Sequence, residues 1–155
     1  MSTVEPWLAG PLGRFVDESA TRITLLMTAA GQVVAQHGFT RRVDVMAAAA
    51  LGAGIVASTE AMARMLGAGG FATLAHQGRT QSLVLLPFAT PRGRWIALVV
   101  FGRETTIGLV QVFLERLAAE VAADMPPEPA RAPLTAERFE QELQDSLRNL
   151  FGRAS

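Results

Sequence analysis

The residues best suited to chemistry are few and widely spaced along the chain. His37 and His76 are the only histidines, and each lies in a segment expected to form a strand. No further His, Asp or Glu stands at a spacing that would complete a metal site around either one. Ser58 and Ser82 fall in an expected helix and strand, without the sharp strand-to-helix turn that exposes a nucleophilic serine. We therefore expect no metal site and no catalytic residue.

The remaining candidates for chemistry are equally weak. The chain has no cysteine, which excludes disulfides, thiolate nucleophiles and zinc–cysteine sites. The glycine-rich run 67–70 lacks the Lys-Ser/Thr ending of a phosphate loop, and it ends a helix instead of opening one. Arg103 and Glu104 are expected on a solvated loop. The sequence predicts a protein that is not an enzyme and binds no cofactor.

Composition narrows the class further. The chain has 155 residues, half of them hydrophobic, which suits one compact domain with a short appendage. Basic and acidic residues balance at 14 each, so no electrostatic footprint for nucleic acid is present. We find no signal peptide, and no uninterrupted apolar run approaches the roughly 18 residues of a membrane span. These features predict a cytoplasmic protein that binds neither nucleic acid nor membrane.

Periodicity and turn signals predict a body of alternating helices and strands over residues 1–124. A short helix opening at Pro11 is weakened by Gly10 and Gly13. The strongest signal is a long alanine-rich helix over residues 44–66, with Asp44 as N-cap and Gly67 as stop. Thr105 or Thr106 caps a last body helix that runs to about residue 123. The strands are expected at residues 23–27, 33–37, 71–76, 81–88 and 95–101. The first two are expected to form a hairpin around an Ala30-Gly31 turn, and residues 89–94 are expected to form the hairpin loop between the last two.

The composition changes after the body. Residues 125–134 are rich in proline, which removes backbone donors and restricts its neighbours, so they are expected to form a semi-rigid linker. Residues 135–151 then form an amphipathic helix, with Thr135 as candidate N-cap. Its apolar face is expected to contain Phe139, Leu143, Leu147, Leu150 and Phe151.

Two features suggest binding surfaces. On the long helix, Ala49, Ala53, Ala57 and Ala61 stand four residues apart and form a ridge of methyl groups that ends at Met65. Ala50, Gly54 and Ser58 run beside this ridge, while Leu51, Ile55, Met62 and Leu66 are expected to serve the core. Such a stripe lets another backbone approach closely, but alanine is also the best helix former, and the stripe could be an internal helix contact.

The tail helix is the second feature. An isolated helix of this length is marginal in water, and its apolar face needs a groove to cover it. The groove can belong to a partner or to the chain's own body.

The order and spacing of several short runs resemble the Roadblock (dynein light chain) family, especially the bacterial MglB proteins that regulate the Ras-like GTPase MglA. The resemblance covers roughly two-thirds of the chain. The fold that it implies is a Roadblock/longin-like α-β-β-α-β-β-β-α sandwich with a five-stranded antiparallel sheet, plus the tail helix. The matching runs are LLMTAAGQVV (25–34), AGIVA (53–57), MLG (65–67), Phe71, HQG (76–78), VVF (99–101) and TTIGLV (105–110).

The resemblance also implies partners and sites. Roadblock domains dimerise through the third strand with their long helices side by side, and the MglB dimer binds one GTPase on that platform. The implied homodimer contacts are Ala50, Gly54, Ser58, Phe71, Thr73, Ala75, His76 and Gly78. The implied contacts to an MglA-like small GTPase are Ala53, Ala57, Ala61 and Met65, with Phe139, Leu143, Leu147, Leu150 and Phe151 of the tail.

In function, the resemblance implies a GTPase activator without an arginine finger, whose tail favours nucleotide exchange, in cell polarity or gliding motility and concentrated at a cell pole. An alternative is a non-activating scaffold that links other Roadblock or polarity proteins. A ligand-sensing module is a third hypothesis, for which few polar residues are available. Three departures from the family pattern are the interrupted first helix, the long 89–94 loop and Glu60 in the long helix.

Overall fold

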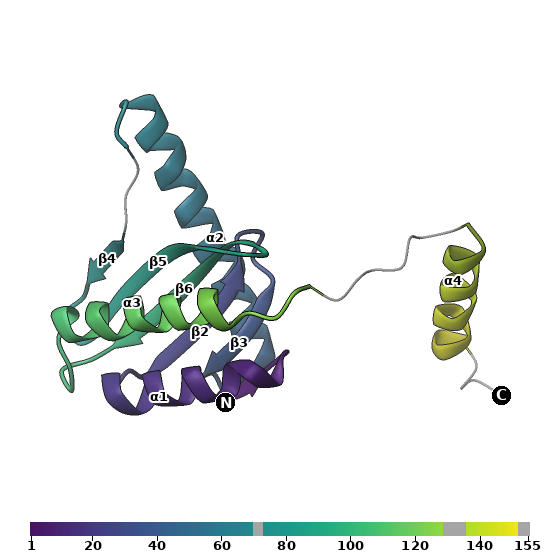
Figure 1. The fold of residues 1–155 in the computed structure, drawn as a ribbon, viewed down its shortest axis with the longest axis horizontal. Helices are drawn as coiled ribbons and strands as arrows, with labels where there is room; N and C mark the ends of the chain where they lie inside the picture. Colours follow the sequence, from purple (N-terminus) through teal and green to yellow (C-terminus); the bar gives the residue numbers. More distant parts are fainter. Residues whose placement is uncertain (70–72, 129–135, 152–155) are drawn as a thin grey trace.

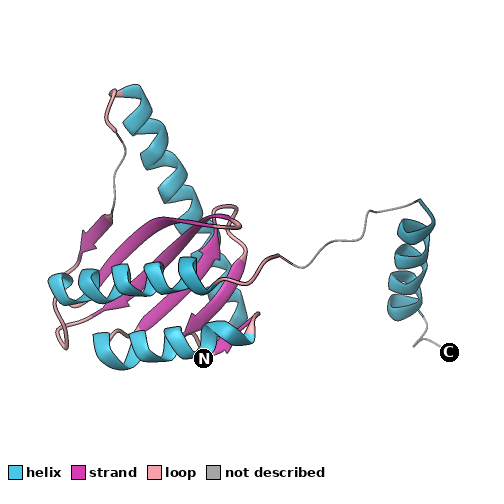
Figure 2. Cartoon of the chain, viewed as in Figure 1, coloured by secondary structure: helices cyan, strands magenta, loops and turns pink. Residues whose placement is uncertain are grey.

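The computed structural model describes residues 1–69, 73–128 and 136–151. Its centre is an antiparallel sheet with strand order β1-β3-β2-β6-β5-β4 (Figures 1 and 2). The strands are β1 Ser2–Thr3, β2 Ile23–Thr28, β3 Val33–His37, β4 Leu74–Gln77, β5 Ser82–Thr90 and β6 Gly93–Phe101. The helices are the 3-10 turn η1 Pro6–Leu8, then α1 Ala9–Ser19, α2 Arg42–Met65, α3 Ile107–Asp124 and α4 Ala136–Phe151.

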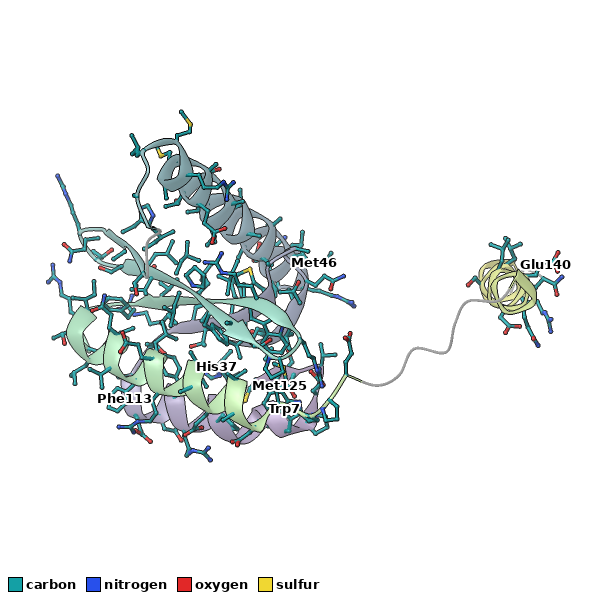
Figure 3. The ribbon with its side chains drawn as sticks, turned by 45° about the horizontal axis from the view of Figure 1, so that its top comes forward. Trp7, His37, Met46, Phe113, Met125 and Glu140 are labelled. Carbon is teal, nitrogen blue, oxygen red and sulfur yellow. The ribbon has the colours of Figure 1, made fainter. Side chains whose placement is uncertain are left out.

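Helices cover both faces of the sheet. α1 and α3 lie together on one face, where Leu12, Leu114 and Val121 pack against strand residues such as Val99. α2 covers the other face through a second cluster. In Figure 3 the labelled Trp7, Phe113 and Met125 lie on the α1–α3 side, whereas Met46 lies on α2. The central strands are therefore buried on both sides, which explains their continuous apolar sequences.

The expected order of helices and strands along the chain is confirmed, and the sheet has one strand more than expected. The short β1 pairs with β3, with Ser2 opposite Gln36 and Thr3 opposite Ala35. The predicted hairpin of β2 and β3 is present, and Gly31 in its turn has a φ of 87°. β1 is only two residues long, which is too short for an alternating pattern of apolar and polar residues to be recognised in the sequence.

The first helix is complete, contrary to the expectation that it is shortened and interrupted at Gly10-Pro11. Pro11 is the third residue of α1, where a backbone N–H has no intrahelical acceptor in any case, so proline removes no helix bond. Gly10 lies on the exposed side of α1, whereas Leu12 and Phe15 are buried against α3 and the sheet. The packing of this face outweighs the low helix propensity of the glycines.

The expected loop over residues 89–94 is also wrong. β5 and β6 continue through these residues, with Ala89 opposite Arg94 and Thr90 opposite Gly93. Only Pro91 and Arg92 remain as the turn, and Gly93 takes a φ of 100° that glycine adopts without strain. The last pair between β2 and β6 is Thr28 with Trp95. Beyond it β5 and β6 continue to pair with each other up to the turn, which satisfies their backbone hydrogen bonds.

The long helix begins two residues earlier than expected, and Asp44 is not its N-cap. Arg41 is the N-cap residue of α2, and Asp44 lies in the first turn with its carboxylate 3.8 Å from the Arg41 guanidinium. By length and composition alone α2 could cross a membrane. In this fold one of its faces packs on the sheet.

The expected core face of α2 is wrong. Leu51, Met62 and Leu66 are exposed, and Ile55 is partly buried. The buried residues are instead mostly small: Val45, Ala49, Gly52, Val56 and Ala63. They face large side chains of the sheet, including Leu85, Leu98 and Met27, so the helix comes close only where its own residues are small.

Candidate protein-binding surface

The outward side of α2 is a largely apolar surface that ends at Arg64 in the last turn, and we call its apolar part the exposed α2 face. Two of its large side chains are mostly exposed to solvent, Leu51 at 69% and Met65 at 85%. Between Ala47 and Ala61 the face contains no charged residue. A large apolar patch on a rigid element is typical of a protein-binding site. The face consists of Val43, Met46, Ala47, Ala50, Leu51, Gly54, Ala57, Ser58, Ala61, Met62, Met65 and Leu66.

The predicted alanine ridge only partly coincides with this face. Ala49 is fully buried and Ala53 is partly buried against the same cluster, whereas Ala57 and Ala61 are exposed. The reason is helix geometry, because residues four apart are offset by about 40° around the axis and a long row turns from the core to solvent. Ala50, Gly54 and Ser58, assigned to the dimer interface, are all exposed. The two predicted sets therefore share one surface.

Glu60 does not interrupt the exposed α2 face. Its carboxylate forms an ion pair with Arg94, which follows the β5–β6 turn at the start of β6. Glu60 is one helical turn from Ala57, and its carboxylate is engaged by Arg94 of the hairpin, so the pair borders the exposed α2 face. The departure of Glu60 from the family pattern is thus an internal tie between α2 and β6.

The edge strand β4 is the second predicted interface. β4 pairs with β5 on one side and is the last strand of the sheet on the other. Ala75 and His76 lie in β4 and are exposed, and Thr73 immediately precedes it. Gly78 follows β4, and its N–H donates to the Gln81 carbonyl at 2.9 Å in the turn to β5. Phe71 lies outside the described residues.

The predicted tail helix is present as α4, and its expected N-cap Thr135 lies outside the described residues. Leu143 and Leu147 are 49% and 46% exposed on it. Phe139, Leu150 and Phe151 belong to α4, but their side chains are outside the described part of the structure. Within the described residues α4 therefore presents an apolar stripe to solvent.

The chemistry-bearing residues do not assemble into a site in the described part of the chain. No group of three His, Asp or Glu residues there could hold a metal ion. His37 ends β3 and His76 lies in β4, at different positions of the sheet. Glu104 accepts hydrogen bonds from Arg22 at 2.7 and 3.1 Å, and this pairing lowers the pKa of the Glu104 carboxyl below its ordinary value. Both side chains are well exposed, so the pair is a surface contact between loops.

The fold is similar to those of several solved structures. The sheet and its helices are similar to those of Myxococcus xanthus MglB, with a TM-score of 0.69 and 23% identity over 78% of this chain and 96% of that one. The gliding protein MglB from Thermus thermophilus has a TM-score of 0.65 and 24% identity, over 76% and 89% of the two chains. A Roadblock/LC7 domain from Streptomyces avermitilis has a TM-score of 0.62 and 21% identity, over 78% and 97%.

The sequence comparisons give one family. No curated protein matches the chain in sequence. The family model for the Roadblock/LC7 domain matches residues 12–100, which is more than half of the chain and contains most of α1, all of α2 and the strands β2 to β6 apart from the last residue of β6. This chain therefore belongs to the Roadblock/LC7 family, with a fold close to that of the MglB proteins.

Proposed function

We propose that this protein is a dimeric regulator of a small Ras-like GTPase and stimulates its GTP hydrolysis. The observation that supports this proposal most is the exposed α2 face, an apolar surface on a helix that the sheet holds in place. Roadblock domains are generally regulatory or adaptor proteins, and the described residues contain no metal cluster that would suggest chemistry of their own. An MglA-like GTPase is the proposed partner.

The proposed stimulation uses binding energy. The centre of the exposed α2 face offers Ala57, Ser58 and Ala61, and the arginine nearest to it, Arg64, lies in the last turn of the helix. A regulator of this kind binds the catalytically competent state of the GTPase better than its other states. A difference of about 1.4 kcal/mol between the free energies of binding to the two states shifts their populations tenfold. The tail helix is proposed to contact the GTPase separately and to favour nucleotide exchange.

The dimer is proposed to form across β4. Because β4 is a sheet edge with exposed Ala75 and His76, the same strand of a second copy can extend the sheet by antiparallel pairing. The two α2 helices would then lie on one face of a continuous sheet. By analogy with the gliding protein MglB, we propose a cytoplasmic role in cell polarity or gliding motility, concentrated at a cell pole.

Proline substitution tests the dimer edge. In an antiparallel strand successive N–H groups alternate in direction, so of Ala75→Pro and His76→Pro one removes an outward donor and the other a bond to β5. We expect the outward variant to fold normally and to dimerise roughly thirtyfold more weakly, since two hydrogen bonds of about 1 kcal/mol each are lost. Light scattering over a concentration series measures this. Dimerisation that is unchanged in both variants, with the fold intact, would rule out pairing through β4.

GTP turnover tests the regulatory activity. We expect the full chain to raise the single-turnover rate of an MglA-like GTPase from the same genome. The matched control is the same reaction with the GTPase alone and with a Roadblock domain that does not bind it. Binding without a change in the rate would contradict the activator proposal and would favour the scaffold, which joins GTPase and polarity proteins without affecting hydrolysis.

A further inference from the structure

A groove lies between the start of α2 and the β1–β3 edge of the sheet, and it encloses about 770 Å³. We call it the α2–β3 groove. Its floor and walls are largely apolar, with Val4, Val33, Phe39, Val45 and Met46 among the lining residues. Arg41 and Arg42 stand at its rim and are exposed, and Asp44 lies 3.8 Å from Arg41, so the rim keeps a net positive charge. An apolar groove with two cations at its rim suits an amphipathic helix that carries negative charge.

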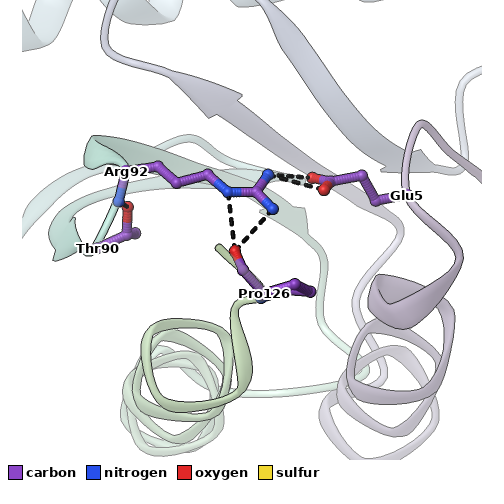
Figure 4. Close-up of polar contacts among 4 residues, drawn as sticks. All are labelled: Glu5, Thr90, Arg92 and Pro126. Atoms are coloured by element: carbon purple, nitrogen blue, oxygen red, sulfur yellow. Dashed lines mark hydrogen bonds and ion pairs between the residues drawn. The ribbon is translucent and has the colours of Figure 1, made fainter. Parts of the chain in front are cut away.

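A clasp around Arg92 brings the tail out of the body beside this groove. The Arg92 side chain, from the β5–β6 turn, donates to both Glu5 carboxylate oxygens at 2.7 and 2.9 Å (Figure 4). It also donates to the Pro126 carbonyl at 3.1 and 2.8 Å, at the start of the linker. The ion pair is mostly shielded, with the Arg92 and Glu5 side chains 13% and 24% exposed. Arg92 thereby links the start of the linker to Glu5, the neighbour in sequence of Val4 in the groove wall.

The linker can carry the tail helix over a distance comparable to the diameter of a small domain. Residues 127–135 separate Pro126 from the start of α4, and a chain of this length spans up to about 30 Å when extended. A tether that reaches its site gives an effective concentration on the order of millimolar, so a contact with a Kd in that range is about half occupied within one chain.

The tail helix and the groove are complementary in charge and in polarity. α4 contains four acidic and two basic residues, so its net charge is opposite to that of the groove rim. Helical spacing places Glu140 beside the stripe that contains Leu143 and Leu147. Leu143 and Leu147 are about half exposed, so they have apolar surface left to cover.

We propose that the α2–β3 groove is the seat of the chain's own tail helix α4. Leu143 and Leu147 enter the groove, and Glu140 lies against the Arg41–Arg42 rim. Met46 and Ala50 line the groove and also belong to the exposed α2 face. A seated tail therefore covers the beginning of the proposed partner surface, and a partner that needs this surface must displace it. The contact itself does not depend on the proposed GTPase regulation.

Paramagnetic relaxation in the full-length protein tests this seat. Because the chain has no cysteine, Gln141→Cys gives a single attachment site for a nitroxide, at an exposed position of α4 on the side away from Leu143 and Leu147. We expect strong relaxation enhancement at the amides of Gln32, Phe39 and Met46 and none at Glu104. We expect the enhancement to be lost in Leu143→Asp/Leu147→Asp, which changes only the tail and leaves the body able to fold.

Charge variants and isotope mixing complete the test. Arg41→Glu/Arg42→Glu should reduce the enhancement, Glu140→Arg should restore it in that background, and the matched control Arg79→Glu should leave it unchanged. Absence of enhancement at the groove, or enhancement that survives both tail substitutions, would overturn the proposal. So would enhancement found only between a nitroxide-bearing chain and an isotope-labelled second copy, which would seat the tail of a partner protomer. No GTPase is present in these samples, so the outcome of this experiment does not depend on whether the proposed GTPase regulation is correct.

Discussion

Ala57→Arg is expected to abolish stimulation of the GTPase without unfolding the protein. Ala57 is exposed near the middle of the exposed α2 face, where the free protein can accommodate a long side chain in water. Arginine is also a good helix former, so the free energy of unfolding should stay within about 0.5 kcal/mol of the parent. At a tight apolar interface, however, the same guanidinium would be buried without a partner. We expect GTPase binding at least about a hundredfold weaker, because such burial costs several kcal/mol.

A matched control separates the surface from the substitution. Ala119 is exposed on α3, on the opposite face of the sheet, so Ala119→Arg introduces the same side chain away from α2. Calorimetric binding and single-turnover GTP hydrolysis are measured for both variants, and light scattering establishes whether each remains a dimer. If Ala57→Arg stimulates hydrolysis like the parent protein, the exposed α2 face is not the GTPase site.

Local sequence signals predicted the elements that have clear starts and stops. The Ala30-Gly31 turn located the β2–β3 hairpin, and Thr106 caps α3 by accepting a hydrogen bond from the Leu109 N–H at 3.3 Å. In both cases the determining contact lies within four residues of the chain. Such contacts can be recognised from residue type and spacing alone.

The orientation of α2 could not be predicted in the same way. Its large residues Leu51, Met62 and Leu66 were expected inside, because burial of large side chains usually contributes most. The sheet beneath α2 already supplies large side chains, so the close contact requires small residues on the helix. Which face is small enough depends on strands that are distant in sequence. The same limit applies to the Arg92 clasp, whose partner Glu5 is 87 residues away.

The seat of α2 on the sheet can be tested at one glycine, Gly52, which is buried where the helix comes closest. A Cβ atom at Gly52 would lie 3.2 Å from Leu98 Cδ1, 3.2 Å from Met27 Cε and 3.5 Å from Leu85 Cδ2. These atoms are ends of flexible side chains, so Gly52→Ala should be nearly neutral: slight crowding offsets a helix-propensity gain of about 1 kcal/mol. Gly52→Leu adds three more carbons that have no room, and we expect it to lower the free energy of unfolding by about 3 kcal/mol.

Gly54 provides the matched control for this prediction, since it lies two residues further along the same helix, is exposed, and a Cβ there meets nothing within 4 Å. Gly54→Leu should keep or raise the stability by about 1 kcal/mol, because leucine is the better helix former. Denaturant unfolding measures both variants, and GTPase binding is then compared at matched folded fraction. We expect Gly52→Leu to lose stability and Gly54→Leu to lose binding instead, since its new side chain projects from the exposed α2 face. Equal stability in the two leucine variants would contradict the seating of α2 through Gly52 and, with it, the orientation that makes this face available to a partner.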